Sequence, residues 1–207
     1  MESVSKRLKE HYEKTFSEFG ASSRGVDWGK DEDLVLRYEN MLSVIKKESD
    51  TSASILDVGC GYGGLLDYAV DRGSELNYTG IDVAENMIDH AKNHHENGVF
   101  YLGDVLHHPF DQRFDYVVCN GILTQKLATT IREMDQFANA LIRRMFELCN
   151  TGIVFNIMSN KVNFMAENLY YRSPVEMLSF CLDNLSSKVR IDHAYPLYEY
   201  TVYVYRE

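Results

Sequence analysis

Long apolar runs, paired cysteines and a surplus of basic charge are all missing from this 207-residue chain. No stretch approaches the roughly 20 apolar residues that cross a bilayer. The polar N-terminus, Met1–Glu10, also lacks the apolar segment of a secretory signal. We therefore expect a cytoplasmic protein with no membrane partner.

The cysteines and the charge balance exclude further classes. Cys60, Cys119, Cys149 and Cys181 lie far apart and form no CxxC pair, so the usual signatures of zinc binding and thiol redox chemistry are absent. The net charge is −10, whereas a protein that neutralises many phosphates needs a surface rich in lysine and arginine. We expect no nucleic-acid partner.

What the chain does contain is enough residues for one domain with a substantial core. Residues 1–48 are predicted to be helical: apolar side chains recur at three- and four-residue spacings in a first helix around Leu8–Phe19 and in a second over Asp31–Lys47. From Ser54 onward, short apolar strands alternate with amphipathic helices. Such alternation predicts a parallel sheet with helices on both faces.

The expected elements after residue 54 are short and regularly spaced. Strands are predicted over 55–58, 78–83, 99–102, 114–119 and 152–157, and helices over 65–71, 85–95, 131–148 and 174–182. Two last strands, Lys188–His193 and Tyr200–Tyr205, are too close together for a crossover helix, so they should pair antiparallel.

A glycine-rich loop, Asp57–Gly64, connects the first of these strands to the helix after it. Glycines allow a tight turn and a close backbone approach to a ligand, and the following helix N-terminus offers free N–H groups. Gly59, Gly61 and Gly64 also satisfy the GxGxxG pattern of dinucleotide-binding domains. Asp57 at the mouth of the strand would repel a pyrophosphate and attract an amino group, which argues against a dinucleotide.

The loop with its flanking strand, Ile55–Gly64 (ILDVGCGYGG), resembles motif I of the class I S-adenosylmethionine (SAM)-dependent methyltransferases. Asp82, which closes the second strand, resembles the acid that holds the ribose hydroxyls in that family. Gly103–Val105 resembles the motif that meets the adenine edge, and Phe114–Leu123 resembles motif IV. The resemblance covers residues 54–207 in order and spacing.

The resemblance implies an α/β Rossmann-like, doubly wound sheet of seven strands in the order 3-2-1-4-5-7-6, with the last hairpin strand antiparallel. It divides the chain into a helical N-terminal lid, residues 1–50, and a SAM-binding domain, residues 51–207. The cofactor would be SAM, leaving as S-adenosylhomocysteine. The cofactor-binding residues implied are Trp28, Arg37, Asp57, Gly59, Cys60, Gly61, Asp82, Val83, Met87, Gly103, Asp104, Val105 and Asn120.

Two of these residues belong to the N-terminal segment. Arg37 is assigned to the cofactor's carboxylate, because a guanidinium matches carboxylate geometry. Trp28 either closes over the cofactor or anchors the core between two helices. The resemblance implies five substrate-binding residues, for which core packing or solvent exposure is the alternative: Tyr12, Phe16, Asn156, Tyr171 and Arg172.

Departures from known subclasses restrict the acceptor. Motif IV reads Asn120-Gly121-Ile122-Leu123 instead of the N-P-P-[YF] of amine-directed DNA and glutamine methyltransferases. Catechol-type enzymes hold magnesium with acidic residues where this chain has Asn120 and Asn156, so no metal is expected. No residue identifies itself as a catalytic base.

We therefore expect methylation of a small-molecule acceptor, with O-methylation of a sugar, nucleotide-sugar or phosphorylated metabolite as the first hypothesis. N-methylation of a small amine is the alternative within the enzyme class. An NAD-dependent oxidoreductase and a catalytically silent SAM-fold protein are the alternatives outside it. Monomer and homodimer both stay open.

Overall fold

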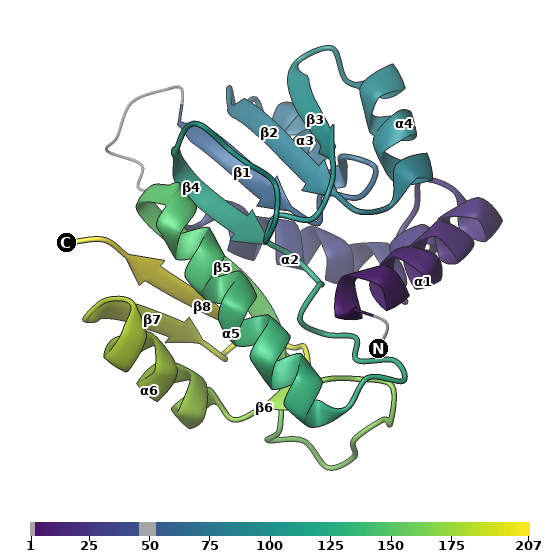
Figure 1. Ribbon diagram of the computed structural model, residues 1–207. Helices are drawn as coiled ribbons and strands as arrows, with labels where there is room; N and C mark the ends of the chain where they lie inside the picture. Colours follow the sequence, from purple (N-terminus) through teal and green to yellow (C-terminus); the bar gives the residue numbers. More distant parts are fainter. Residues whose placement is uncertain (1–2, 46–52) are drawn as a thin grey trace.

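The computed structural model describes residues 3–45 and 53–207, which form a central sheet with helices on both faces (Figure 1). The strands are β1 Ser54–Val58, β2 Asn77–Asp82, β3 Gly98–Leu102, β4 Phe114–Cys119, β5 Cys149–Ser159, β6 Tyr171–Arg172, β7 Lys188–Asp192 and β8 Glu199–Tyr205. Their order is β3-β2-β1-β4-β5-β8-β7, with β6 paired to β5 off this path. Strands β1 to β5 run parallel to one another.

The predicted architecture is confirmed, with one addition. Strand β8 runs antiparallel to both β5 and β7, as the short connection between the last two strands requires. The sequence analysis missed β6, which pairs Tyr171 and Arg172 with the end of β5. Two residues are too few to show a period in the sequence.

The helices and one 3-10 turn cover the two faces of the sheet and the carboxyl ends of its parallel strands. They are α1 Val4–Phe19, η1 Arg24–Val26, α2 Asp31–Leu42, α3 Gly64–Asp71, α4 Glu85–His94, α5 Ile131–Leu148 and α6 Pro174–Asn184. Local signals set several ends: Thr130 and Glu133 form a capping box at α5, and Pro174 occupies the first turn of α6.

Alternation along the buried strands divides the core between the two faces. Leu56 and Val58 of β1 pack with α5 and α6, where Met145 and Met177 are fully buried. Ile55, the residue before Leu56, packs on the other face with α2, α3 and α4. Successive side chains of a strand point to opposite faces, so a strand covered by helices on both sides is apolar throughout.

Helix α1 lies outside both layers, across the carboxyl ends of the parallel strands (Figure 1). It contacts η1, then α4 from one face of the sheet and α5 from the other. Side chains tie it there: Asn86 of α4 donates to the Glu13 carbonyl, and Thr15 donates to the carbonyl of Gly25. The N-terminal segment is thus placed over the edge where parallel α/β sheets bind ligands.

Two expectations reach beyond the described residues. The second helix was predicted to end at Lys47 and ends at Leu42. The predicted 50/51 domain boundary falls within residues 46–52, which lie outside the described ranges.

A bilayer-spanning segment would need a longer apolar run than any helix within 3–45 and 53–207 provides.

Candidate functional site

A cavity with about 940 Å³ of empty space, part of it open to solvent, lies where β1, β2 and β4 end. Its floor is the glycine loop, including Gly59 and Gly61, and the segments that follow β2, β3 and β4. Ser5, Leu8 and Tyr12 of α1 line it from the opposite side. Ligands of open α/β sheets bind at this edge, so the cavity is the candidate site.

Asp82, at the end of β2, is held with both carboxylate oxygens facing backbone donors. The Gly61 N–H donates to Oδ2 at 2.9 Å and the Ala84 N–H donates to Oδ1 at 2.8 Å. Gly61 has a φ of 55°, the left-handed region that favours glycine, and this turn aims its N–H at Asp82. Each carboxylate oxygen has a second lone pair, so Asp82 can still accept two hydrogen bonds from a ligand.

Asp57, at the end of β1, is 3% exposed and lines the same cavity. The Tyr78 hydroxyl donates to its Oδ2 at 2.6 Å, while Oδ1 is buried with no hydrogen-bond partner. Burial raises the pKa of the Asp57 carboxyl to about 7, although the Tyr78 hydrogen bond acts in the opposite direction. A buried acceptor without a partner disfavours the ionised form until a donor arrives.

Asn120, just after β4, supplies a second acceptor of the same kind. Its Oδ1 is buried without a hydrogen-bond partner, and the residue lines the cavity with Asp57. Buried polar atoms in folded proteins are nearly always paired. Two unpaired oxygens at one cavity therefore indicate a ligand that brings hydrogen-bond donors.

Asp104, after β3, connects the floor of the cavity to α1. The Ser5 hydroxyl donates to Asp104 Oδ2 at 2.6 Å, and the Leu106 N–H donates to Oδ1 at 2.9 Å. Around this end the cavity is otherwise apolar. The apolar side chains that line it there come from β2, α4 and α5 and from the segments after β2, β3 and β4: Ile81, Val83, Met87, Val105, Ile122, Phe137 and Leu141.

Trp28 closes the cavity beside the segment after β4. Gly121 there has a φ of 94°, and a Cβ at this position would meet the indole ring at 3.0 Å. The guanidinium of Arg37 stacks on the Trp28 ring, 3.7 Å from a ring centroid. Trp28 therefore contacts both a backbone position that only glycine fits well and a cation on its face.

The structure brings the predicted cofactor-binding residues together at this cavity with one exception. Trp28, Asp57, Gly59, Cys60, Gly61, Asp82, Val83, Met87, Gly103, Asp104, Val105 and Asn120 all line it. Arg37 does not, and the assignment of Arg37 to a cofactor carboxylate is corrected. Its guanidinium is buried against Glu199 of β8, with contacts of 2.8 to 3.1 Å, so an internal carboxylate takes the place predicted for an external one.

Of the predicted substrate-binding residues, only Tyr12 lines the cavity. Phe16 packs near the Tyr62 and His90 rings on the side toward α4. Asn156 is 1% exposed, accepts a hydrogen bond from the Gly121 N–H and donates to Glu199, so both ends of its amide are occupied inside the protein. These placements correct the predictions for Phe16 and Asn156.

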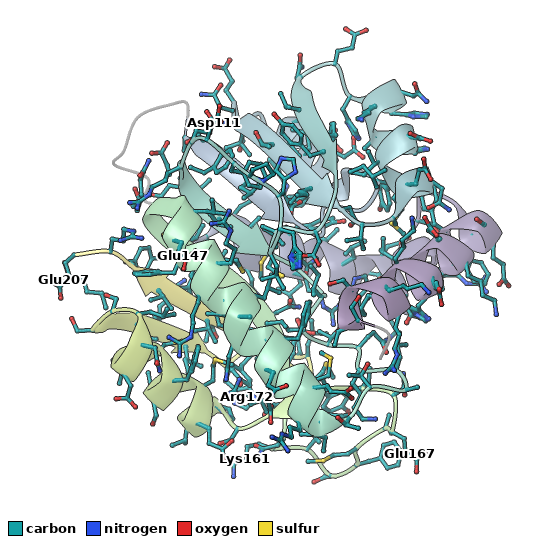
Figure 2. All side chains as sticks on the ribbon, viewed as in Figure 1. Asp111, Glu147, Lys161, Glu167, Arg172 and Glu207 are labelled. Atoms are coloured by element: carbon teal, nitrogen blue, oxygen red, sulfur yellow. The ribbon has the colours of Figure 1, made fainter. Side chains whose placement is uncertain are left out.

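Tyr171 and Arg172 also lie away from the cavity. The Tyr171 hydroxyl accepts a hydrogen bond from the Ala166 N–H, and Arg172 donates to Asn139 of α5 at 2.8 Å. Figure 2 shows Arg172 beside the N-terminal half of α5. Strand β6 thus places Arg172 against this helix and Tyr171 against the loop before β6, and neither placement could be predicted because β6 itself was not.

Sequence reasoning also missed residues that line the cavity. Leu8 and Tyr38 stood on apolar helical faces, and their spacing indicated burial without showing against what. Ser5 gave no signal, since a serine near a chain start is ordinary. In the described part of the chain, no three His, Cys, Asp or Glu side chains gather as they would to hold a metal ion.

Comparisons with known proteins agree with this geometry. A family model described as "Methyltransferase domain" matches residues 55–143. A Mycobacterium tuberculosis protein named as a methyltransferase is 33% identical over 153 residues, which are 73% of this chain and 92% of that relative. A ubiquinone biosynthesis O-methyltransferase of Coxiella burnetii is 42% identical over 74 residues, 33% of this chain and 31% of that protein.

Among solved structures, the SAM-bound amino pentose methyltransferase of Micromonospora echinaspora superposes with a TM-score of 0.63 at 14% identity. The match covers 92% of this chain and 97% of that one. At this identity the likeness shows a shared fold.

Proposed function

Because this chain belongs to the class I SAM-dependent methyltransferases, we propose that it methylates a hydroxyl oxygen of a sugar, nucleotide-sugar or phosphorylated metabolite. The observation that carries the proposal is the convergence of Asp57, Asp82 and Asp104 on one cavity, at the ends of β1 and β2 and just after β3. Three carboxylates around an otherwise largely apolar cavity favour a ligand with hydroxyl and amino donors.

The residues present fit SAM. Asp82, with one lone pair free on each oxygen, would accept hydrogen bonds from a vicinal diol such as the ribose. The unpaired Asp57 Oδ1 and Asn120 Oδ1 would face the ammonium of the methionine part. Asp104 would meet the adenine edge, and Met87 with its apolar neighbours would pack on the ring.

When bound, SAM supplies an electrophilic methyl group on a sulfonium. The chain's own contribution is positioning and the removal of water. Leu8, Tyr12 and Trp28 line the cavity together with the glycine loop, and a bound cofactor packed against them would displace water. We assign residues 1–50 the role of a lid, and residues 51–207 that of the SAM-binding domain.

Support for the acceptor class comes from the names of similar proteins. The Coxiella relative is named as an O-methyltransferase, and the Micromonospora neighbour acts on an amino pentose. Tyr12 would contact the acceptor, since it is the predicted acceptor residue that lines the cavity.

N-methylation of a small amine is the second candidate. The amino pentose neighbour and the net charge of −10, which suits a cationic acceptor, both favour it. The two candidates share the cofactor cavity and differ in the acceptor group alone.

Two measurements test the proposal. Isothermal titration calorimetry should detect binding of S-adenosylhomocysteine and none of NADH; the reverse would overturn the methyltransferase assignment. Incubation with methyl-tritiated SAM and a small-molecule extract should label a low-mass product that loses its label under conditions that cleave methyl ethers. Label only in protein or nucleic acid, or no label at all, would overturn the small-molecule proposal.

A further inference from the structure

A chain of four polar side chains spans the space between α1 and the loops that follow β4 and β5. Asn168 donates from Nδ2 to Gln125 Oε1 at 3.1 Å, and Gln125 donates from Nε2 to Asp27 Oδ2 at 2.8 Å. His11 Nε2 lies 2.9 Å from the same Asp27 oxygen. No role assigned so far uses His11, Asp27, Gln125 or Asn168.

The direction of these hydrogen bonds fixes the proton on His11. Gln125 uses its oxygen to accept from Asn168, so its amide nitrogen must donate to Asp27. Asp27 is then an acceptor, and His11 Nε2 must carry the hydrogen that points at it. In a neutral imidazole the other nitrogen, Nδ1, is left with a free lone pair. Among the described residues Nδ1 has no hydrogen-bond partner.

Asp27 lies beside the cavity in a left-handed backbone conformation. Its φ of 61° and ψ of 34° are uncommon for residues other than glycine, and aspartate and asparagine adopt them more readily than most. Both its neighbours, Val26 and Trp28, line the cavity, as does Tyr12 next to His11. The pair, called the rim pair below, borders the cavity without lining it: the centroid of the His11 ring lies 5.1 Å from that of the Tyr12 ring. The side chains of His11 and Asp27 are 26% and 37% exposed, so an acceptor that extends out of the cavity can reach them.

The charge of Asp27 also acts inside the cavity. Burial, followed by the charges of Asp27 and Asp82, raises the pKa of the Tyr12 hydroxyl well above its usual value. The Tyr12 hydroxyl therefore lies within electrostatic reach of Asp27 and of the carboxylate assigned to the ribose. The rim pair thus stands next to the cavity-lining residue that was assigned above to the acceptor.

We propose that His11, oriented by Asp27, is the general base that takes the proton of the acceptor hydroxyl, a role that rests on the methyltransferase function proposed above. A neutral hydroxyl loses its proton as it attacks, whereas a free amine needs no such base. The oxygen forms a bond to the methyl carbon, the carbon–sulfur bond breaks with its electron pair left on sulfur, and the proton passes to His11 Nδ1. The imidazolium is stabilised by the Asp27 carboxylate and later releases the proton to water.

His11→Gln is the informative variant, because the glutamine amide can still donate to Asp27 but cannot take up a proton. His107→Gln is the matched control, since His107 is exposed and makes no hydrogen bond with its side chain in the described structure. We expect His11→Gln to lower methyl transfer into the extract by about 10²- to 10⁴-fold. S-adenosylhomocysteine affinity should change less than twofold, and the control should retain full activity.

Two measurements distinguish a His11 that acts as a general base from a His11 that only holds α1 in place. Added imidazole should restore part of the activity of His11→Ala, and none of it should return if His11 only holds α1 in place. Independently of turnover, ¹⁵N NMR of the histidine rings, assigned by comparison with His11→Gln, should show the Nε2–H tautomer for His11. An Nδ1–H tautomer, or a His11→Gln variant as active as the control, would overturn the proposal.

The failures of the two proposals are distinguishable. Wild-type protein that binds no S-adenosylhomocysteine, or that labels no small molecule, refutes the proposed function and this role with it. Wild-type protein that labels an amine nitrogen, or that labels a hydroxyl equally well without His11, refutes only the role of His11.

Discussion

Arg37 of α2 and Glu199 of β8, 162 residues apart in the chain, form a buried ion pair with the guanidinium Nε and Nη2 both on the carboxylate. Glu199 also accepts from the Asn156 amide, whose oxygen accepts from the Gly121 N–H. The N-terminal segment is thereby connected to β8, β5 and the segment after β4. The same arginine stacks on Trp28, so one ion pair positions a wall of the candidate cavity.

Removing one charge of this pair should lower the stability of the protein. We expect Glu199→Ala to cost about 3–5 kcal/mol in the free energy of unfolding, since it leaves Arg37 buried without a counter-charge. Arg37→Met combined with Glu199→Leu should recover most of that loss. Urea denaturation measures both, with Glu39→Ala, which breaks an exposed pair with Arg72, as the control expected to change stability by less than about 1 kcal/mol. If the stability losses of the single Arg37 and Glu199 variants simply add up in the double variant, the two residues are not coupled.

The Asp82 carboxylate should carry a large part of cofactor affinity. Asp82→Ala should weaken S-adenosylhomocysteine binding by about 1–3 kcal/mol, because buried ribose hydroxyls would lose their acceptor. Titration calorimetry of the folded variant measures the change. Asp89→Ala, on the exposed face of α4, should leave the affinity for S-adenosylhomocysteine unaltered. If Asp82→Ala also leaves this affinity unaltered, Asp82 is not part of the binding site.

Cofactor binding should depend on pH through Asp57. Its pKa of about 7 means that the carboxyl is largely protonated at pH 6 and ionised at pH 8. An ammonium group prefers the ionised form, so affinity for S-adenosylhomocysteine should rise by about tenfold from pH 6 to pH 8. Calorimetry in buffers of different ionisation enthalpy should detect proton release on binding near pH 7. Asp57→Asn should bind more weakly and without this pH dependence.

The raised pKa of Asp57 also makes the stability of the ligand-free protein depend on pH. The folded pKa lies above the ordinary value of 3.8, so between about pH 4 and pH 7 the unfolded chain binds fewer protons at this site than the folded one. The contribution of Asp57 to stability is therefore greatest at low pH and falls as pH rises toward 7. Asp57→Asn should flatten this slope in thermal melts; a steeper slope would contradict it.

Gly121 should tolerate no side chain. Gly121→Ala would hold a residue with a Cβ at φ 94° and press that Cβ against Trp28. We expect a loss of about 1–3 kcal/mol in stability and weaker cofactor binding. Gly20→Ala is the matched control: its φ of 63° is also left-handed, yet a Cβ there meets nothing within 4 Å, so it should lower stability and leave cofactor affinity alone.

Much of the cofactor half of the site could be predicted from the sequence, because local order fixes it. Gly59, Gly61 and Asp82 follow their strands directly, and parallel strands bring their carboxyl ends to one edge of the sheet. Asp104 follows the third strand in the same way. Adjacency in the chain and the parallel topology together were enough to place these residues at one cavity.

The positions of Arg37 and Asn156 could not be predicted in this way. Arg37 was expected at a ligand carboxylate, and no local signal revealed that Glu199, 162 residues later, would meet it first. Asn156 was likewise expected to face an acceptor, but its strand is covered on both faces and its amide is used inside the protein. Partners brought together by long-range packing leave no trace in sequence spacing.

The amino-acid sequence by itself determined the alternation of strands and helices, the glycine loop and the order of the acidic residues, since each depends on neighbours a few positions apart. Only the tertiary structure decided what α1 covers and which carboxylate holds Arg37, and it alone brought His11 to Asp27. These contacts join segments whose separation in the chain says nothing of their distance in space. The packing of α1 on η1, α4 and α5, and the meeting of α2 with β8, bring them together.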